Sequence, residues 1–170
     1  SMADHIHSPR IIQKMLRCIT RDVDILIGAD SKPLFIDVEE ATKILVANDR
    51  VIKIGKNLKK FTHVDIGLFI IKRSILKVLK NFIKDETFSL SDIINVAIAE
   101  NYTVKVVDIR GDYWTEVDTP SDLDKVLNGS RRIVVSRVLD LLRLARIPYL
   151  EHRLIPPETY SQGLLGEEVL

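Results

Sequence analysis

The sequence is poor in cysteine and has no long apolar run, and both absences exclude classes of protein. Cys18 is the one cysteine among 170 residues, so no disulfide forms within the chain and a reducing compartment is favoured. No apolar run approaches the roughly 20 residues of a membrane-spanning helix, and the first residues lack the apolar core of a secretory signal. These absences predict a cytoplasmic chain without a transmembrane segment.

Charge of one sign is also absent. Lysine and arginine number 25 against 24 aspartates and glutamates, and the net charge is +1. That balance argues against a general polyanion binder, so no nucleic-acid partner is expected. Hydrophobic residues make up 46% of the chain, which excludes a disordered protein. One domain with a single core is the default at this length, and Cys18 is expected to be a small buried residue rather than a nucleophile.

Segments typical of strands alternate with segments typical of helices, and this order predicts an α/β fold. A hairpin around Asn48-Asp49 makes the sheet mixed rather than wholly parallel. The strands are expected at residues 24–29, 41–47, 50–54, 63–71 and 103–109, and the helices from Pro9, from Ser74 and from Ser89 or Ser91.

Two carboxylates, Glu116 and Asp118, end a short aromatic and β-branched run, and a helix follows at once. Thr119 suits the N-cap of that helix and Asp122, three residues later, suits a capping box. Alternation along an extended segment puts the two acids on one face, at the edge where α/β folds bind ligands. A Mg²⁺ site for phosphate chemistry and a capped helix with solvated acids are equally compatible with this spacing.

Three other places carry candidate chemistry. Asp4-His5-Ile6-His7 reads as a metal ligand at a strand end or as a charged tail, and it is weak evidence for zinc. Lys56 follows Gly55 at the close of a strand and suits a phosphate contact, but its spacing alone favours one more exposed lysine beside Lys53, Lys59 and Lys60. Asp65 interrupts an apolar strand, so it is expected to face a polar cavity or a hydrogen-bond partner. Gly67, two residues on, suggests close approach of a ligand or backbone.

Taken in order, these elements resemble the nucleotidyltransferases that join a nucleotide to a sugar, polyol or choline phosphate. The resemblance is nearest to the archaeal and thermophilic CTP:inositol-1-phosphate cytidylyltransferases, and the few glycines with many Ile, Val and Lys suit a thermophile. It implies a Rossmann-like mixed sheet flanked by helices. The matching elements are Asp4-His5-Ile6, Glu40-Ala41-Thr42-Lys43, Ile54-Gly55-Lys56, Asp65-Ile66-Gly67-Leu68-Phe69 and Trp114-x-x-x-Asp118-Thr119-Pro120-x-Asp122-Leu123.

The resemblance also implies roles for these residues. Asp4 matches a metal-binding aspartate, and the second Mg²⁺ ligand is either Asp118, which is favoured, or Glu116. Lys56 matches a lysine that contacts the acceptor phosphate, while Thr42, Asp65 and Gly67 would line the acceptor pocket. The implied reaction joins CTP to a polyol or sugar phosphate, giving a product of the CDP-inositol type and releasing pyrophosphate.

The chain departs from the family pattern in one large respect, because it contains no glycine-rich loop of the kind that cradles the triphosphate. An N-terminally incomplete domain over residues 1–128 is therefore expected, followed by a basic amphipathic helix at 129–147 and a poorly ordered tail at 148–170. The chain is then a fragment, a partner of another chain that supplies the first half, a homo-oligomer, or a non-catalytic interaction module.

Overall fold

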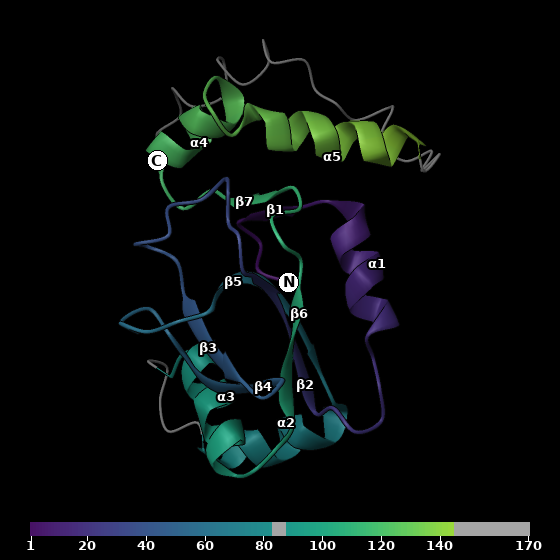
Figure 1. Ribbon diagram of the computed structural model, residues 1–170, viewed down its shortest axis with the longest axis vertical. Coiled ribbons are helices and arrows are strands. Elements are labelled where there is room, and N and C mark those ends of the chain that lie inside the picture. The colour runs from purple at the N-terminus through teal and green to yellow at the C-terminus, as the bar shows by residue number, and fades with distance from the viewer. Residues whose placement is uncertain (83–87, 145–170) are drawn as a thin grey trace, which may run out of the picture.

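A five-stranded mixed sheet with helices on its faces forms the centre of the computed structural model, which describes residues 1–82 and 88–144 (Figure 1). The strand order is β4-β3-β5-β2-β6, with β2 and β6 parallel and the other neighbours antiparallel. The predicted α/β class with a mixed sheet is confirmed. The strands are β2 (Ile25–Asp30), β3 (Lys43–Ala47), β4 (Arg50–Gly55), β5 (His63–Ile71) and β6 (Val104–Asp108).

The sheet separates two hydrophobic cores. Alternate side chains of β2 point to opposite faces, as a pleated strand requires: Ile25 and Ile27 enter one core and Leu26 the other. Helix α1 (Pro9–Arg17) covers the face of Leu26 through two buried residues, Ile11 and Met15. The opposite face is covered by α2 (Arg73–Leu79), the short 3-10 helix η1 (Lys80–Phe82) and α3 (Leu90–Ala99).

Local signals in the sequence account for several element boundaries. The β3–β4 hairpin turns at Asn48 and Asp49, whose φ angles of 49° and 61° are those of a type I′ turn. Ser89 caps α3, and its hydroxyl accepts from the backbone N–H of Asp92. Cys18 is exposed, contrary to expectation, because α1 ends at Arg17 and the cysteine is its C-cap residue.

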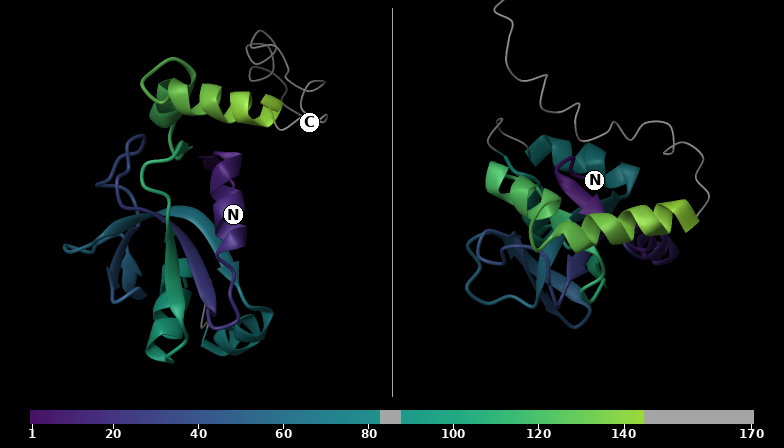
Figure 2. Two further views of the ribbon diagram at one scale, coloured as in Figure 1. Left: turned by 45° about the vertical axis from the view of Figure 1, so that its right-hand side comes forward. Right: turned by 90° about the horizontal axis from the view of Figure 1, so that it is seen from above.

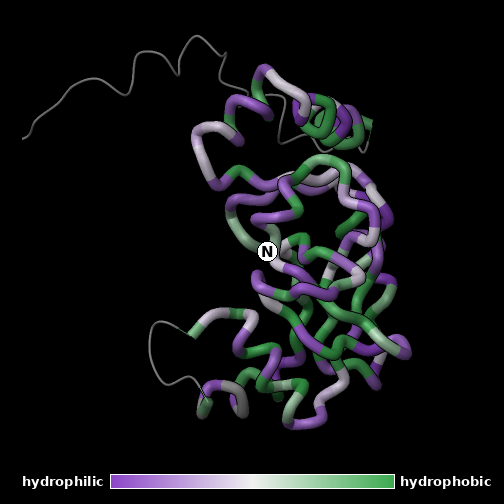
Figure 3. The backbone as a smooth tube through the Cα atoms, turned by 60° about the vertical axis from the view of Figure 1, so that its left-hand side comes forward, coloured by the Kyte–Doolittle hydropathy of each residue, from purple (hydrophilic) through white to green (hydrophobic). Residues whose placement is uncertain are grey.

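A small antiparallel sheet of β1 (His5–His7) and β7 (Trp114–Glu116) lies beyond the end of the large sheet, near α4 and α5 (Figure 2). Thr119 caps α4 (Pro120–Leu127) and forms the predicted capping box with Asp122. Helix α5 (Arg132–Leu144) buries Val134 and Val138. Hydrophobic and hydrophilic residues are interspersed along the described chain, α5 included (Figure 3).

The helix predicted at 129–147 is thus observed as α5 over a shorter span, and residues 145–147 and the tail at 148–170 lie outside the described residues. Arg131, just before α5, is 5% exposed. Its guanidinium donates to Asp122 Oδ1 at 3.1 Å and to the Glu116 carbonyl at 3.2 Å, so it ties α4 to the end of β7. None of the helices in the described part of the chain has the length and apolar character needed to cross a membrane.

Asp30, the last residue of β2, joins the large sheet to the small one. Its carboxylate is fully buried and accepts three hydrogen bonds. Oδ1 accepts from the backbone N–H groups of Lys32 and Gly111 at 2.9 and 2.7 Å, and Oδ2 accepts from Trp114 Nε1 at 2.8 Å. A buried carboxylate is stable only when it is hydrogen-bonded in this way. The side chain therefore fixes β7 relative to β2.

We expect Asp30→Ala to lower the free energy of unfolding by about 3 kcal/mol or more, because it leaves the Trp114 indole N–H and two backbone N–H groups without their acceptor. Urea denaturation of the purified chain measures this loss. Asp124→Ala on the exposed surface of α4 is the matched control and is expected to change stability by less than about 0.5 kcal/mol. Equal stability of the two variants would contradict the assigned role of Asp30.

Candidate active site

Residues from five separate segments surround one cavity of about 50 Å³ at the junction of the two sheets. Five of the residues predicted for the site line it, namely Thr42, Lys56, Asp65, Glu116 and Asp118. The structure thus brings together side chains that are far apart in the sequence. The remaining lining residues are Met2, His5 and Glu40.

His5 connects this cavity to the other two predicted residues, Asp4 and Gly67. Its Nδ1 lies 2.7 Å from Asp4 Oδ1 and its Nε2 lies 3.6 Å from Glu116 Oε2. The ring stacks on Trp114, with a centroid distance of 6.0 Å, and its side chain is only 4% exposed. His5 therefore holds the carboxylate of Asp4, just before β1, and that of Glu116 in β7 in fixed relation, and its segment is a paired strand rather than a charged tail.

Gly67 makes room for that ring. Its φ is +72°, and a Cβ built there would lie 2.7 Å from His5 Cδ2. The group that a Cβ would meet is thus the His5 ring, whereas the sequence suggested a ligand or backbone. The N–H of Gly67 donates to Asp65 Oδ1 at 2.8 Å, which gives the half-buried Asp65 the hydrogen-bond partner expected for it.

The carboxylates of the site differ in their electrostatic surroundings. Burial raises the pKa of Asp65 from 3.8 to about 7. Burial, reinforced by the nearby Asp118 carboxylate, also raises the pKa of Glu116. The pKa of Asp4 is lowered, chiefly by its hydrogen bond with His5. Lys56 is the one cationic amine among the residues that line the cavity.

These carboxylates suit a hard divalent cation such as Mg²⁺. Within residues 1–82 and 88–144, no group of three or more His, Cys, Asp and Glu side chains forms a complete metal cage. Magnesium ions in phosphate chemistry are commonly held by one or two carboxylates and completed by water and substrate phosphates. Asp4 and Asp118 are the candidates for such a donor set, because the Val117 N–H donates to the Asp4 carbonyl at 2.9 Å and so brings the two segments side by side.

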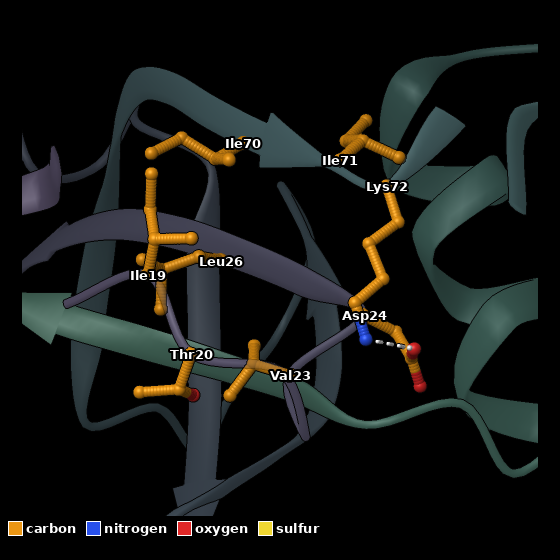
Figure 4. Close-up of a pocket in the computed structure, with 8 residues that line it drawn as sticks. All are labelled: Ile19, Thr20, Val23, Asp24, Leu26, Ile70, Ile71 and Lys72. Carbon is orange, nitrogen blue, oxygen red and sulfur yellow. Dashed lines mark hydrogen bonds and ion pairs between the residues drawn. The ribbon is translucent and has the colours of Figure 1, made fainter. Parts of the chain in front are cut away.

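A second cavity, of about 90 Å³, lies away from these groups, between the residues after α1 and the ends of β2 and β5 (Figure 4). Its lining is mostly apolar. Its two charged side chains, Asp24 and Lys72, pair with one another at 3.1 Å. This pairing leaves the second cavity without the convergent polar groups of the first.

No family model matches the chain. Curated relatives and solved structures do resemble it. The chain is 36% identical over 123 residues to "Bifunctional IPC transferase and DIPP synthase" of Rubrobacter xylanophilus, a match that covers 72% of this chain and 28% of the relative. A protein of the same name from Archaeoglobus fulgidus is 36% identical over 138 residues, or 81% of this chain and 25% of the relative. The chain thus spans about a quarter of the length of these two relatives.

The inositol-1-phosphate CTP transferase of T. maritima has a solved structure with the same fold. It matches with a TM-score of 0.67 and 28% identity, over 79% of this chain and 53% of that one. The fold inferred from the sequence is therefore confirmed by comparison, as is the resemblance.

The raised pKa of Asp65 predicts how stability changes with pH. Because the native carboxyl holds its proton up to about pH 7 and the unfolded one only to 3.8, the native state binds more protons between these values. The free energy of unfolding should therefore fall as pH rises through this window, by at most roughly 1.4 kcal/mol per pH unit. Asp65→Asn, which keeps an oxygen for the Gly67 N–H, is expected to remove this slope.

Urea denaturation at a series of pH values from 4 to about 8 measures the slope. The surface variant Asp124→Asn serves as the control and should retain the wild-type pH dependence. Parallel curves for wild type and Asp65→Asn would show that Asp65 titrates as an ordinary exposed carboxylate.

Proposed function

We propose that this chain, which belongs to the sugar- and polyol-phosphate nucleotidyltransferase superfamily and lies close to its inositol-1-phosphate cytidylyltransferases, carries the acceptor and metal part of such an enzyme. The transferred group would be CMP from CTP, and the acceptor a polyol or sugar phosphate that gives a CDP-inositol type of product. The observation that carries this proposal is the shared cavity, where Lys56 and Asp65 meet Glu116 and Asp118. A cytoplasmic location remains a prediction from the sequence.

The lining of the cavity fits a phosphorylated polyol. Lys56 offers a cation for the acceptor phosphate, while Asp65 and Thr42 offer oxygen atoms for its hydroxyl groups. In the reaction, an oxygen of the acceptor phosphate would attack the α-phosphorus of CTP, and the bond from that phosphorus to the leaving pyrophosphate would break. Such chemistry needs position and electrostatics rather than a covalent nucleophile.

Asp4 and Asp118 are the residues that would hold Mg²⁺. When bound, this ion would neutralise charge on the reacting phosphates. Asp118 is preferred over Glu116 as the second ligand, because Glu116 already faces His5 Nε2 at 3.6 Å and has a pKa raised by burial. Glu116 would then not bind the metal and would contact His5 instead. His5 would orient both Glu116 and Asp4.

An interaction module without catalysis is the second candidate. Three large apolar side chains on or just after α1 are exposed: Ile12, Leu16 and Ile19 at 47%, 58% and 52%. Exposed apolar side chains aligned on one helix favour a binding partner.

Pyrophosphate release separates the two candidates. The chain is incubated with CTP, inositol 1-phosphate and Mg²⁺, and pyrophosphate is measured with and without the acceptor. Release that depends on the acceptor and is abolished by Asp118→Ala rules out the non-catalytic module. No release by the folded chain contradicts transfer by this chain alone, and metal binding then tests whether the chain keeps the metal part of the site.

Metal binding tests the site without requiring activity. We expect the chain to bind Mn²⁺, a magnesium substitute visible by electron paramagnetic resonance, and Asp4→Asn or Asp118→Asn to weaken binding at least about tenfold, because each removes a charged ligand. Asp124→Asn, which changes a carboxylate on the far surface of α4, should bind as the wild type does. Equal binding by all four proteins would refute the assignment of Asp4 and Asp118.

A further inference from the structure

Lys43, the first residue of β3, is a buried lysine at the back of the candidate active site. Only 6% of the surface of this residue is exposed. Its Nζ donates to three backbone carbonyls, those of Glu39 at 2.7 Å, Ala41 at 3.2 Å and Lys56 at 3.1 Å. An ammonium group has three N–H donors, so every donor of Lys43 is in use.

In the part of the chain that the structure describes, no carboxylate forms an ion pair with Lys43. The ion pairs found within residues 1–82 and 88–144 all involve other side chains. Carbonyl dipoles solvate the ammonium but do not cancel its charge, and burial of an ion without a counter-ion costs free energy. The positive potential of Lys43 therefore extends to neighbouring groups with little screening by water.

The carbonyls that Lys43 holds belong to two segments of the cavity wall. One segment, residues 39–42, carries Glu40 and Thr42, and the other carries Lys56. The β3–β4 pairing ends where Lys43 lies opposite Gly55. Lys56, the next residue, is therefore outside this pairing. The bond from Lys43 to the Lys56 carbonyl is what anchors that residue against the 39–42 segment.

We propose that Lys43 is a positioning residue that makes the acceptor site selective for a phosphorylated ligand. It anchors the backbone of Lys56, a residue that lines the cavity, and it adds a second, fixed positive charge behind the cavity wall. This inference rests on the proposed function, because it takes the cavity to be the acceptor site. Lys43 does not itself touch the ligand.

A purely structural staple gives a different expectation. Loss of a staple would lower stability and weaken binding of any ligand to the same degree. Loss of a positioning cation weakens the binding of a phosphorylated polyol much more than the binding of the same polyol without its phosphate. The ratio of the two affinities therefore distinguishes the roles, and a change in melting temperature does not.

The experiment measures binding of inositol 1-phosphate and of inositol to the chain by titration calorimetry at low ionic strength. Lys43→Met removes the charge and the donors at similar side-chain length, and we expect it to lose about tenfold in affinity for the phosphate ester, with inositol binding little changed. Lys43→Arg keeps the charge and should recover most of that loss. Should Lys43→Met fail to fold, Lys43→Gln replaces it as the neutral variant that still donates hydrogen bonds.

Two controls accompany these variants. Lys53→Met removes an exposed lysine from the neighbouring strand β4 and should leave both affinities unchanged. Ile44→Ala removes a fully buried side chain next to Lys43 in sequence, and should lower the melting temperature without changing the ratio of affinities.

The outcomes separate this inference from the proposed function. If the wild-type chain binds inositol 1-phosphate and the Lys43→Met variant keeps the same selectivity, the role of Lys43 is overturned and the proposed function stands. A folded wild-type chain that binds neither compound overturns the acceptor site and, with it, the role of Lys43. Selective loss in the neutral variant with recovery in Lys43→Arg supports both.

Discussion

The hydrogen bond from the Trp114 indole to the buried carboxylate of Asp30 determines where the candidate active site can form. It is the link between a sheet that is stable through its two hydrophobic cores and a two-stranded sheet that is too small to be stable alone. Trp114 itself packs into the core on the α1 face, so the tryptophan brings both apolar contact and a polar anchor to β7. The three hydrogen bonds that Asp30 accepts offset the cost of burying its carboxylate.

From Trp114 a chain of contacts leads to the carboxylates. The indole stacks on the ring of His5, which lies against Asp4 on one side and faces Glu116 on the other. Gly67 permits this arrangement, because any side chain at its position would occupy the space of the ring. Candidate chemistry on β1, β5 and β7 is thus held together through one buried histidine. The position of the acids depends on packing as much as on the strands that carry them.

Local signals in the sequence predicted the helices, strands and turns well. Contacts between residues far apart in the chain could not be predicted from it. The capping box of Thr119 and Asp122 and the turn at Asn48-Asp49 depend on neighbouring residues only, so their chemistry is visible in the sequence. The carboxylates at 116 and 118 were recognised for the same reason. Cys18 was misjudged because burial at a helix end depends on where the helix stops.

His5 and Lys43 could not be assigned roles from the sequence, since each acts on partners that only the folded chain brings near. A signal for His5 did exist: alternation in an extended Asp-His-Ile-His segment puts both histidine rings on one face. Asp30 showed the same mark as Asp65, a single acid in or at the end of an apolar strand, and such an acid must find donors or a polar cavity. Lys43 carried no comparable signal, because lysines are common at strand ends.

Electrostatic balance connects the fold to the proposed chemistry. Four carboxylates and the amine-bearing Lys56 line the cavity, and two of the four acids, Asp65 and Glu116, have pKa values raised by burial. A raised pKa means that the folded site favours a bound positive charge, and a proton or a metal ion can provide it. Protons and divalent cations therefore compete for this group of acids, and metal affinity should rise as the acids lose their protons. The same acids would repel the proposed acceptor phosphate, and the proposed roles of Lys56 and Lys43 supply the positive charge that would offset this repulsion.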